Sequence, residues 1–333
     1  MKQLINPISK IIIEDSKKVF NRSDKSRKKL TLVTGAGGLL GYAIRQLAPK
    51  DTDYITRSDG DLTDFAKTKK IFQKIKPNQV IHLAAEVAGI GGNMMHSGKF
   101  FRDNIMININ IFEAARINGV DKLISFMSTC VFPDKCKYPL NEKDIQSGPP
   151  HPSNFGYAYA KRMLEVQSAA YRKEWGCNFI VAIPTNIYGE NDFWNLEDGH
   201  VIPSLIHKCF LAKKNKEDFI VWGSGRSLRE FVYSQDVAKL ILWAIDEYNE
   251  ESPIIFTNSK ESSIKDLVDL VVKEVGFKGK VIFDITKPEG QFRKPSDNSK
   301  LKKYLPNFKF TPLDKGIKNT VEWFIKNYPN VRM

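Results

Sequence analysis

The sequence contains no long hydrophobic run. Its most apolar stretch, Asn178 to Gly189, is short and is interrupted by Pro184 and Asn186, whereas a membrane-spanning helix needs about 20 consecutive apolar residues. The N-terminus also lacks the apolar core of a secretory signal, because Pro7 and Lys10 interrupt it. These absences argue against a spanning helix and a signal peptide, and we expect a soluble protein with no membrane partner.

Cysteine is scarce as well. The chain has four cysteines, Cys130, Cys136, Cys177 and Cys209, and they form neither a CxxC pair nor the spacing of a metal site. Scattered single cysteines are typical of reduced thiols in a cytosolic protein rather than of a disulfide framework. We therefore expect a cytoplasmic protein without a bound metal, and we interpret all but Cys130 as structural residues.

Acidic residues are outnumbered, 38 against 51 basic ones, which gives a net charge of +13. The first 29 residues alone hold nine basic and three acidic residues, so nearly half of the excess lies in an N-terminal extension. No RRM, helix-turn-helix or zinc-finger pattern accompanies the charge, and we expect no nucleic-acid partner. The mildly basic remainder suits an anionic small molecule.

From Leu30 onward, short apolar runs alternate with segments of helical spacing. Strands are expected at Leu30–Val33, Tyr54–Thr56, Val80–Ala84, Lys122–Met127 and Phe179–Ile183, and helices at Leu39–Leu47, Phe65–Ile75, Phe101–Ile117 and Tyr157–Glu174. Such alternation predicts an α/β fold, a Rossmann-like doubly wound parallel sheet with helices on both faces.

A glycine-rich loop, Thr34-Gly35-Ala36-Gly37-Gly38-Leu39-Leu40-Gly41, follows the first expected strand and opens the first helix. Gly35 permits a tight turn, Gly38 allows the backbone to approach a pyrophosphate, and Gly41 allows close packing of helix and strand. The helix N-terminus then offers N–H donors to phosphates. An ordinary strand–helix turn is the alternative, but the order of strand, loop and helix favours a dinucleotide site.

Beyond Pro184 the alternation loosens. Helices are expected at Ile202–Leu211, Ser234–Tyr248, Ser263–Val275 and Pro312–Asn327, and strands at Phe219–Trp222, Pro253–Thr257 and Lys280–Asp284. We predict an extension (1–29), a Rossmann NAD(P)-binding domain (30–183 with about 232–258) and a smaller discontinuous C-terminal α/β substrate domain (184–231 and 259–333).

The end of the second expected strand bears on the choice of cofactor. NAD sites usually carry an acidic residue there for the ribose 2′-OH, and Tyr54 to Arg57 offers none. Arg57 suits a 2′-phosphate instead, which favours NADP(H), although an exposed arginine on a solvated loop is the alternative. Asp61 and Leu62 are placed near the adenine.

Tyr157 and Lys161 stand four residues apart on one expected helix. A lysine cation nearby would lower the pKa of Tyr157 from about 10 towards neutrality. The spacing recurs by chance in a lysine-rich chain, but Ser128, after an expected strand, gives it context. Together these residues indicate a hydride-transfer site in which Tyr157 exchanges a proton.

These motifs and His82-Leu83-Ala84-Ala85 resemble the extended short-chain dehydrogenase/reductases. Five further segments make the chain similar to the GDP-L-fucose synthase family, from about Leu30 to Tyr328. They are Ser128-Thr129-Cys130-Val131-Phe132-Pro133, Ile183-Pro184-Thr185-Asn186-Ile187-Tyr188-Gly189, Asp198-Gly199-His200-Val201-Ile202-Pro203, Val221-Trp222-Gly223-Ser224-Gly225 with Arg229-Glu230-Phe231, and Lys287-Pro288-Glu289-Gly290. The resemblance implies 3,5-epimerisation and NADPH-dependent 4-reduction of GDP-4-keto-6-deoxymannose.

The resemblance also implies roles for individual residues. Cys130 would remove a proton next to the C4 ketone and His200 would return one, while Ser128 and Tyr157 stabilise the C4 oxygen. A thiolate at neutral pH needs a lowered pKa, which a nearby cationic histidine or lysine would provide. Taken alone, Cys130 is more typical of a buried strand-end thiol, and His200 of a loop or helix-cap residue.

Ligand contacts carry over by resemblance too. For the cofactor they are Gly35, Gly37, Gly38, Leu39, Leu40, Gly41, Arg57, Asp61, Leu62, Leu83, Ala84, Ala85, Tyr157, Lys161, Pro184, Asn186, Ile187 and His200. For the GDP-sugar they are Asn186, Lys208, Trp222, Arg229, Glu289 and Lys294. Arg229 and Lys208 suit the diphosphate, and Trp222 suits packing on guanine.

The family usually forms a homodimer through two long helices, here Phe101–Ile117 and Tyr157–Glu174, although an apolar helix face is equally explained by the core of a monomer. Three other functions stay open at this point. They are reduction of a different GDP-4-keto sugar of colitose or heptose type, UDP-sugar 4-epimerase or 4,6-dehydratase activity, and dinucleotide binding without catalysis.

Overall fold

The computed structural model describes residues 29–87, 89–287 and 291–333. Residues 1–28 of the basic extension and the candidate substrate residue Glu289 lie outside the described residues. Among the described residues, no helix is both long and apolar enough to cross a membrane. All four cysteines are free; Cys177 and Cys209 are buried, and Cys136 packs against a core cluster.

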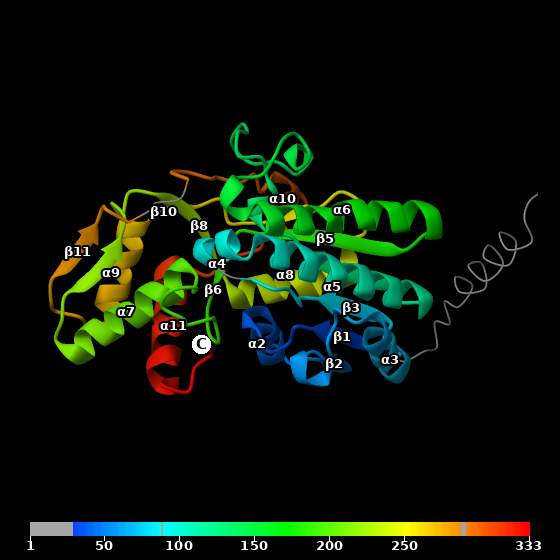
Figure 1. Ribbon diagram of the computed structural model, residues 1–333, viewed down its shortest axis with the longest axis horizontal. Helices are drawn as coiled ribbons and strands as arrows, with labels where there is room; N and C mark the ends of the chain where they lie inside the picture. The colour runs from blue at the N-terminus through cyan, green and yellow to red at the C-terminus, as the bar shows by residue number, and fades with distance from the viewer. Residues whose placement is uncertain (1–28, 88, 288–290) are drawn as a thin grey trace, which may run out of the picture.

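A six-stranded parallel sheet organises the chain (Figure 1). Its order is β2-β1-β3-β4-β5-β9, and every neighbouring pair is parallel. The strands are β1 (Thr31–Thr34), β2 (Thr52–Tyr54), β3 (Gln79–His82), β4 (Lys122–Phe126), β5 (Asn178–Pro184) and β9 (Ile254–Phe256). The prediction of a doubly wound, Rossmann-like α/β sheet is confirmed.

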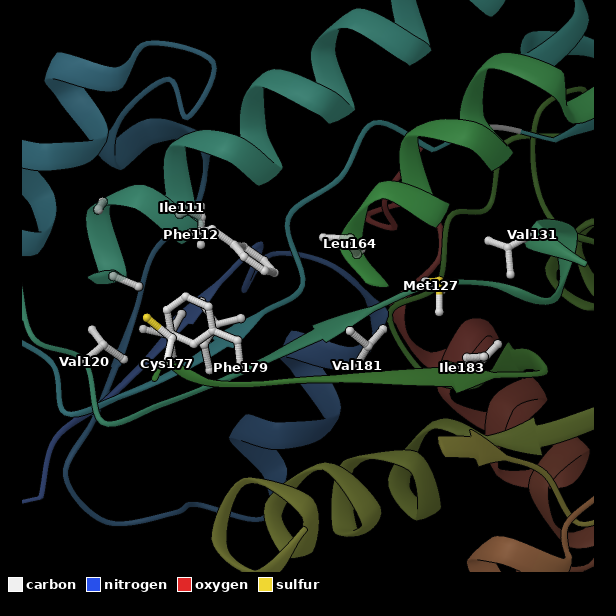
Figure 2. Packing of buried hydrophobic residues seen from close by; sticks show 14 of the residues in the cluster. Ile111, Phe112, Val120, Met127, Val131, Leu164, Cys177, Phe179, Val181 and Ile183 are labelled. Atoms are coloured by element: carbon white, nitrogen blue, oxygen red, sulfur yellow. The ribbon is translucent and has the colours of Figure 1, made fainter. Parts of the chain in front are cut away.

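Helices cover both faces because side chains alternate along each strand. Leu32 and Val80 face one core cluster, while the adjacent Val33 and Ile81 face another. The first cluster lies under α3 (Phe65–Ile75), α5 (Ser97–Ile117) and α6 (Phe155–Trp175), and the second under α2 (Leu39–Gln46) and α8 (Ser234–Glu247). Figure 2 shows Phe112 and Leu164 of the first cluster beside the strand that carries Phe179 and Val181.

Several predicted boundaries in this half are displaced by two residues or more, among them the end of β3 at His82 rather than Ala84 and the start of α6 at Phe155 rather than Tyr157. The long helix α5 begins at Ser97 rather than Phe101, directly after the short α4 (Ile90–Met95), which was not predicted. The second strand spans Thr52–Tyr54 rather than Tyr54–Thr56. It ends early because the Thr56 side chain and the Asp59 carboxylate form a capping box that starts a 3-10 turn.

The second half adds a three-stranded sheet, β10-β8-β6, and a two-stranded sheet, β11-β7. The strands are β6 (Asn186–Tyr188), β7 (Phe219–Trp222), β8 (Leu228–Tyr233), β10 (Glu261–Ser263) and β11 (Val281–Asp284); the helices are α7 (Val201–Asn215), α9 (Ile264–Val275), α10 (Ser299–Tyr304) and α11 (Leu313–Asn327). The sequence analysis missed β6, β8, β10 and α10. The elements β6, β10 and α10 are short, whereas β8 spans six residues and carries the charged Arg229 and Glu230.

A buried carboxylate joins the smaller sheet to the main one. Glu230 on β8 is 1% exposed and accepts hydrogen bonds from the Thr257 hydroxyl and the Ser296 amide, each 2.9 Å long. Thr257 directly follows β9 of the main sheet. The sheets are therefore linked through side chains as well as through the chain itself.

Candidate cofactor and active site

The glycine-rich loop lies at the carboxyl end of β1, against the segment that follows β3. Gly35 has a φ of +67°, and a Cβ there would lie 2.6 Å from the Ala84 amide nitrogen. A Cβ on Gly41 would lie 2.5 Å from the Ala36 backbone, so Gly41 allows close packing against the loop itself. A side chain at either position would collide with the backbone of a neighbouring segment, so glycine allows the loop to pack closely there.

The first turn of α2 is available to a ligand. Its N-cap residue is Gly38, which has no side chain to cap the helix, and the first turn contains no acidic residue. The first N–H groups of a helix have no partner within it, so those of Leu39, Leu40 and Gly41 face outward as donors. Backbone N–H donors at a positive helix end fit the pyrophosphate of a dinucleotide.

His82 links the strands and the helix next to this loop through hydrogen bonds, a role that the sequence analysis did not assign. Its Nδ1 lies 2.9 Å from the Thr34 hydroxyl, and its Nε2 lies 3.1 Å from the Asn108 side-chain oxygen. Burial, with Lys161 nearby, lowers the pKa of His82 to about 3. The imidazole is therefore neutral and ties β1, β3 and α5 together. The same Thr34 hydroxyl accepts a hydrogen bond from the Ala84 amide at 3.2 Å.

Arg57 is the exposed cation at the end of β2. Its side chain is 82% exposed, and it pairs with Glu86, which follows β3. Glu86 is a partner of the guanidinium, and the high exposure of Arg57 is compatible both with a phosphate contact and with an arginine on a solvated loop. Asp61 accepts hydrogen bonds from the Thr63 amide and hydroxyl, which lower the pKa of Asp61.

The neighbouring residues of this region are placed as follows. The Leu62 carbonyl accepts a hydrogen bond from Asn110 of α5 at 2.9 Å, and the Leu62 side chain packs on the core. Leu83, Ala84 and Ala85 are half-buried after β3, Pro184 is buried at the end of β5, and Ile187 packs on the core from β6. The Leu83 amide donates to the Thr34 carbonyl at 3.3 Å, which places this segment beside the start of the glycine loop.

Tyr157 and Lys161 lie on one face of α6, and both are buried, at 9% and 5% exposure. The Lys161 Nζ is 5.8 Å from the centroid of the Tyr157 ring. Burial raises the pKa of Tyr157, and a Cys130 thiolate adds to this effect. The prediction of a lowered Tyr157 pKa is therefore wrong in this structure, because loss of water opposes the phenolate. Burial also lowers the pKa of Lys161 to about 8.

Ser128 and Cys130 follow β4. Ser128 is the N-cap of a 3-10 turn (Thr129–Val131) that carries Cys130. Burial raises the pKa of the Cys130 thiol, while Lys294, a hydrogen bond with Ser128 and Lys161 act in the opposite direction. The predicted lowering of this pKa is therefore wrong, although the predicted cations are present as Lys294 and Lys161.

His200 is the N-cap residue of α7, but its ring makes no capping hydrogen bond. Its side chain is 52% exposed, and its Nδ1 lies 3.8 Å from Oδ1 of Asp192, whose side chain is only 2% exposed. Asp192 raises the pKa of His200, whereas burial and Arg332 oppose the rise. The pKa of His200 is shifted by Asp192 and Arg332, whereas the pKa of Cys130 is shifted by Lys294, Ser128 and Lys161. The two side chains therefore have different charged neighbours.

Two groups form among the residues expected at the sugar nucleotide. The Lys208 Nζ lies 4.2 Å from the centroid of the Trp222 ring, and Trp222 is 49% exposed. Burial lowers the pKa of Lys208. The Lys287 Nζ also lies over this ring, 5.6 Å from its centroid, so Trp222 is a half-exposed aromatic side chain flanked by two lysines.

The second group lies near Cys130. Arg229 on β8 donates to the Leu228 carbonyl at 2.7 Å and lies close enough to lower the pKa of Lys294. Lys294 in turn favours the Cys130 thiolate. Asn186 is exposed on β6 and donates to the Glu230 carbonyl at 2.8 Å. Arg229, Lys294 and Cys130 therefore form one connected group.

Two residues that the sequence analysis missed touch the glycine loop. The Asn191 side-chain amide donates to the Gly37 carbonyl at 3.2 Å, and the Arg332 guanidinium donates to the same oxygen at 3.4 Å. Asn191 lies in a turn-rich stretch with no periodic pattern, and Arg332 lies far away in the chain. Neither has a local sequence signal that could have revealed the contact.

The class of protein follows from this geometry. A parallel sheet with a glycine loop after β1 and a Tyr–Lys pair on α6 is typical of the extended short-chain dehydrogenase/reductases. Residues 31–257 match the NAD dependent epimerase/dehydratase family.

Individual relatives narrow this further. The GDP-L-fucose synthase of Dictyostelium discoideum is 46% identical over 319 residues, which cover 93% of this chain and 99% of the relative. A GDP-L-fucose synthetase from Naegleria fowleri, solved bound to NADP, matches with a TM-score of 0.88 and 41% identity over 92% of this chain and 96% of that one. A GDP-L-colitose synthase of Yersinia pseudotuberculosis is more distant, at 33% identity over 90% of this chain and 99% of that protein. The chain belongs to the GDP-L-fucose synthase branch of the NAD dependent epimerase/dehydratase family, as the motifs predicted.

Proposed function

We propose that the protein is an NADPH-dependent 3,5-epimerase and 4-reductase that converts GDP-4-keto-6-deoxy-D-mannose to GDP-L-fucose. One observation carries the proposal furthest: Tyr157 and Lys161 lie buried on one face of α6, 5.8 Å apart from ring centroid to Nζ, and Cys130, after β4, and Lys294 belong to the same charged surroundings. A proton donor, a thiol and two cations are thereby joined in a single partly buried group. Relatives that share most of the chain are named as synthases of this class.

The cofactor would be held by the first-turn amides of α2 and by Arg57. The amides suit a pyrophosphate, and Arg57 suits the 2′-phosphate that distinguishes NADPH from NADH. NADPH, when bound, supplies the hydride for reduction at C4. A 2′-phosphate would compete with Glu86 for the Arg57 guanidinium, since the two groups already form an ion pair.

The proton chemistry falls to residues of the chain. The C4 ketone acidifies the hydrogens at C3 and C5, so Cys130 removes a proton and His200 delivers one. Burial opposes the Cys130 thiolate that must remove this proton, whereas Lys294, Ser128 and Lys161 favour it, and Asp192 favours the His200 cation that can give a proton. Ser128 and Tyr157 stabilise negative charge on the C4 oxygen. Because burial keeps Tyr157 protonated at neutral pH, it is suited to donate its proton to that oxygen.

The sugar nucleotide would meet the two groups described above. Trp222 offers a face for guanine, and Lys208 beside it, with Arg229 on β8, offers charge to the diphosphate. Asn186 and Lys294 complete the proposed contacts. This arrangement assigns recognition of the nucleotide to the second half of the chain and chemistry to the sheet end.

We also propose a cytoplasmic homodimer. Apolar side chains of α5 and α6 are exposed, among them Phe101, Met106 and Ile109 on α5 and Phe155 and Val166 on α6. Pairing of these helices between two copies would cover them. Sedimentation of the purified protein should give twice the 38.0 kDa mass of the chain, and a species of monomer mass at micromolar concentration would contradict this.

The test is turnover of GDP-4-keto-6-deoxy-D-mannose with NADPH in deuterated water, with the product examined by NMR. We expect NADPH consumption and deuterium at both C3 and C5. Cys130→Ser and His200→Gln should lose deuterium incorporation, whereas the matched control Cys136→Ser should keep it. Reduction without deuterium would refute the roles of Cys130 and His200. Turnover only with another GDP-4-keto sugar would instead indicate a colitose- or heptose-type enzyme.

A further inference from the structure

A segment close to the C-terminal end of the described chain lies on the glycine loop. After α11 ends at Asn327, the chain turns back, and the Arg332 carbonyl accepts a hydrogen bond from the Trp194 amide at 2.8 Å. The Arg332 Nη1 lies 3.4 Å from the Gly37 carbonyl and 3.2 Å from the position that a Cβ on Gly38 would take. Figure 1 marks the C-terminus beside α2, in agreement with these contacts.

The guanidinium is held in place but is not fully paired. Its Cζ lies 5.6 Å from the centroid of the Phe193 ring, which supports one face of it. Its Nε is buried and has no hydrogen-bond partner among the described residues. A buried N–H without an acceptor is costly, and the Nη1 end of the guanidinium, whose contact with the loop is exposed, is the part that an added ligand can reach.

The charge of the surroundings indicates what that ligand is. A helix N-terminus carries partial positive charge, and a cation beside it is unfavourable unless an anion joins them. The first turn of α2 contains no acidic residue. Asp192 is the nearby carboxylate that acts on Arg332; its Oδ1 faces His200 and accepts from the Phe193 amide at 2.8 Å, and its buried Oδ2 makes no hydrogen bond with Arg332 or with any other described residue. The loop, the helix end and Arg332 therefore form a site for an added anion.

We propose that Arg332 is a cofactor-binding residue that holds the pyrophosphate of the dinucleotide against the glycine loop. The inference rests on the proposed use of NADPH. Arg332 contacts Gly37, which belongs to the pyrophosphate loop, whereas Arg57 lies at the end of β2, where a 2′-phosphate is expected. The two arginines thus serve different phosphates, and this difference can be measured.

The experiment titrates the full-length protein with NADPH and with NADH and follows binding directly by calorimetry, without turnover. For Arg332→Gln we expect both dissociation constants to rise by about 10- to 100-fold, the loss of one charged hydrogen-bonding contact. Arg332→Lys should recover part of the affinity. Arg57→Gln should weaken NADPH alone. Lys326→Gln, an exposed charge on α11, is the matched control and should change neither.

Three results would overturn the assignment. Dissociation constants of Arg332→Gln within twofold of the wild type would show that the residue does not hold the cofactor. Loss of NADPH affinity alone would place Arg332 at the 2′-phosphate. A lower melting temperature of the unliganded variant with unchanged affinity would make its role structural. Failure of the wild-type protein to bind either dinucleotide would instead refute the proposed function.

Discussion

Gly41 offers a quantitative test of how tightly α2 packs against the glycine loop. Glycine inside a helix is normally replaced by alanine with a gain of about 0.5–1 kcal/mol. At Gly41, however, the added methyl would lie 2.5 Å from the Cα and carbonyl oxygen of Ala36. Because those atoms are backbone, no side chain can rotate away. The helix start and the loop must separate by about 0.9 Å to reach an ordinary contact of 3.4 Å.

The expected magnitude follows from that separation. Overpacking of this kind typically costs about 1–3 kcal/mol, and we take the upper half because backbone must move. After the helical gain is subtracted, Gly41→Ala should lose about 1–2 kcal/mol in free energy of unfolding. With an unfolding entropy near 2.1 cal/mol/K per residue, a chain of this length loses about 1.5 °C in Tm for each kcal/mol. We therefore expect a fall of about 2–3 °C.

The assay is thermal unfolding of the unliganded protein, followed by NADPH titration. The matched control is Gly98→Ala on α5, where a Cβ would meet nothing within 4 Å, and there Tm should rise by about 1 °C. Since the displaced segment supplies the proposed pyrophosphate donors, Gly41→Ala should also weaken NADPH at least tenfold. A Gly41→Ala protein that melts at or above the wild-type temperature with unchanged NADPH affinity would refute the reasoning.

Three further predictions concern single side chains. Tyr157→Phe should lower kcat by about 10²- to 10⁴-fold, while the dissociation constant of NADPH changes less than threefold. Steady-state kinetics and calorimetry measure the two quantities, and an equal loss of both would contradict a proton-donor role. Trp222→Ala should raise KM for the GDP-sugar at least tenfold and leave NADPH binding unchanged; an unaltered KM would remove Trp222 from the guanine site. The pKa of His82 is about 3 in the folded protein, below its ordinary value of 6.5. As the pH falls, the unfolded chain therefore binds a proton before the folded protein does, and the free energy of unfolding that is present above pH 6.5 decreases. Urea unfolding between pH 7 and 5 should show a slope approaching about 1.4 kcal/mol per pH unit from this group that His82→Gln reduces, and an equal slope in the variant would exclude His82 as its source.

The parts of the fold that the sequence predicted well are those whose signal is local. The glycine loop, the first strand and the helices α3 and α9 each carry their own periodicity, turn residues or cap within a dozen positions. The strands β6, β8 and β10 carry no comparable signal. They are stabilised by pairing with one another across distant parts of the chain, as in the register of Glu261 with Glu230. Such pairing is set by tertiary structure.

The same distinction applies to the candidate site. Residue types and spacing were sufficient to group Tyr157 with Lys161 on one helix face. The direction of the Tyr157 pKa was not predictable, because it depends on how far the folded chain removes the phenol from water. Arg332 was out of reach for a similar reason: its contact with Gly37 joins segments 295 positions apart.

The chain passes more than once between the main sheet and the smaller sheets, and this path limits which segments can be exchanged between related proteins. The backbone leaves the six-stranded sheet after β5, returns through α8 to β9, and leaves again for β10. Glu230 then fastens these passages to one another. A single crossover between two related genes after β5 would keep Glu230 with Thr257 and Ser296, but it would also exchange α8 and β9, which belong to the main sheet and its covering helices. New substrate preferences on this scaffold are more readily acquired by point substitutions than by recombination of contiguous blocks.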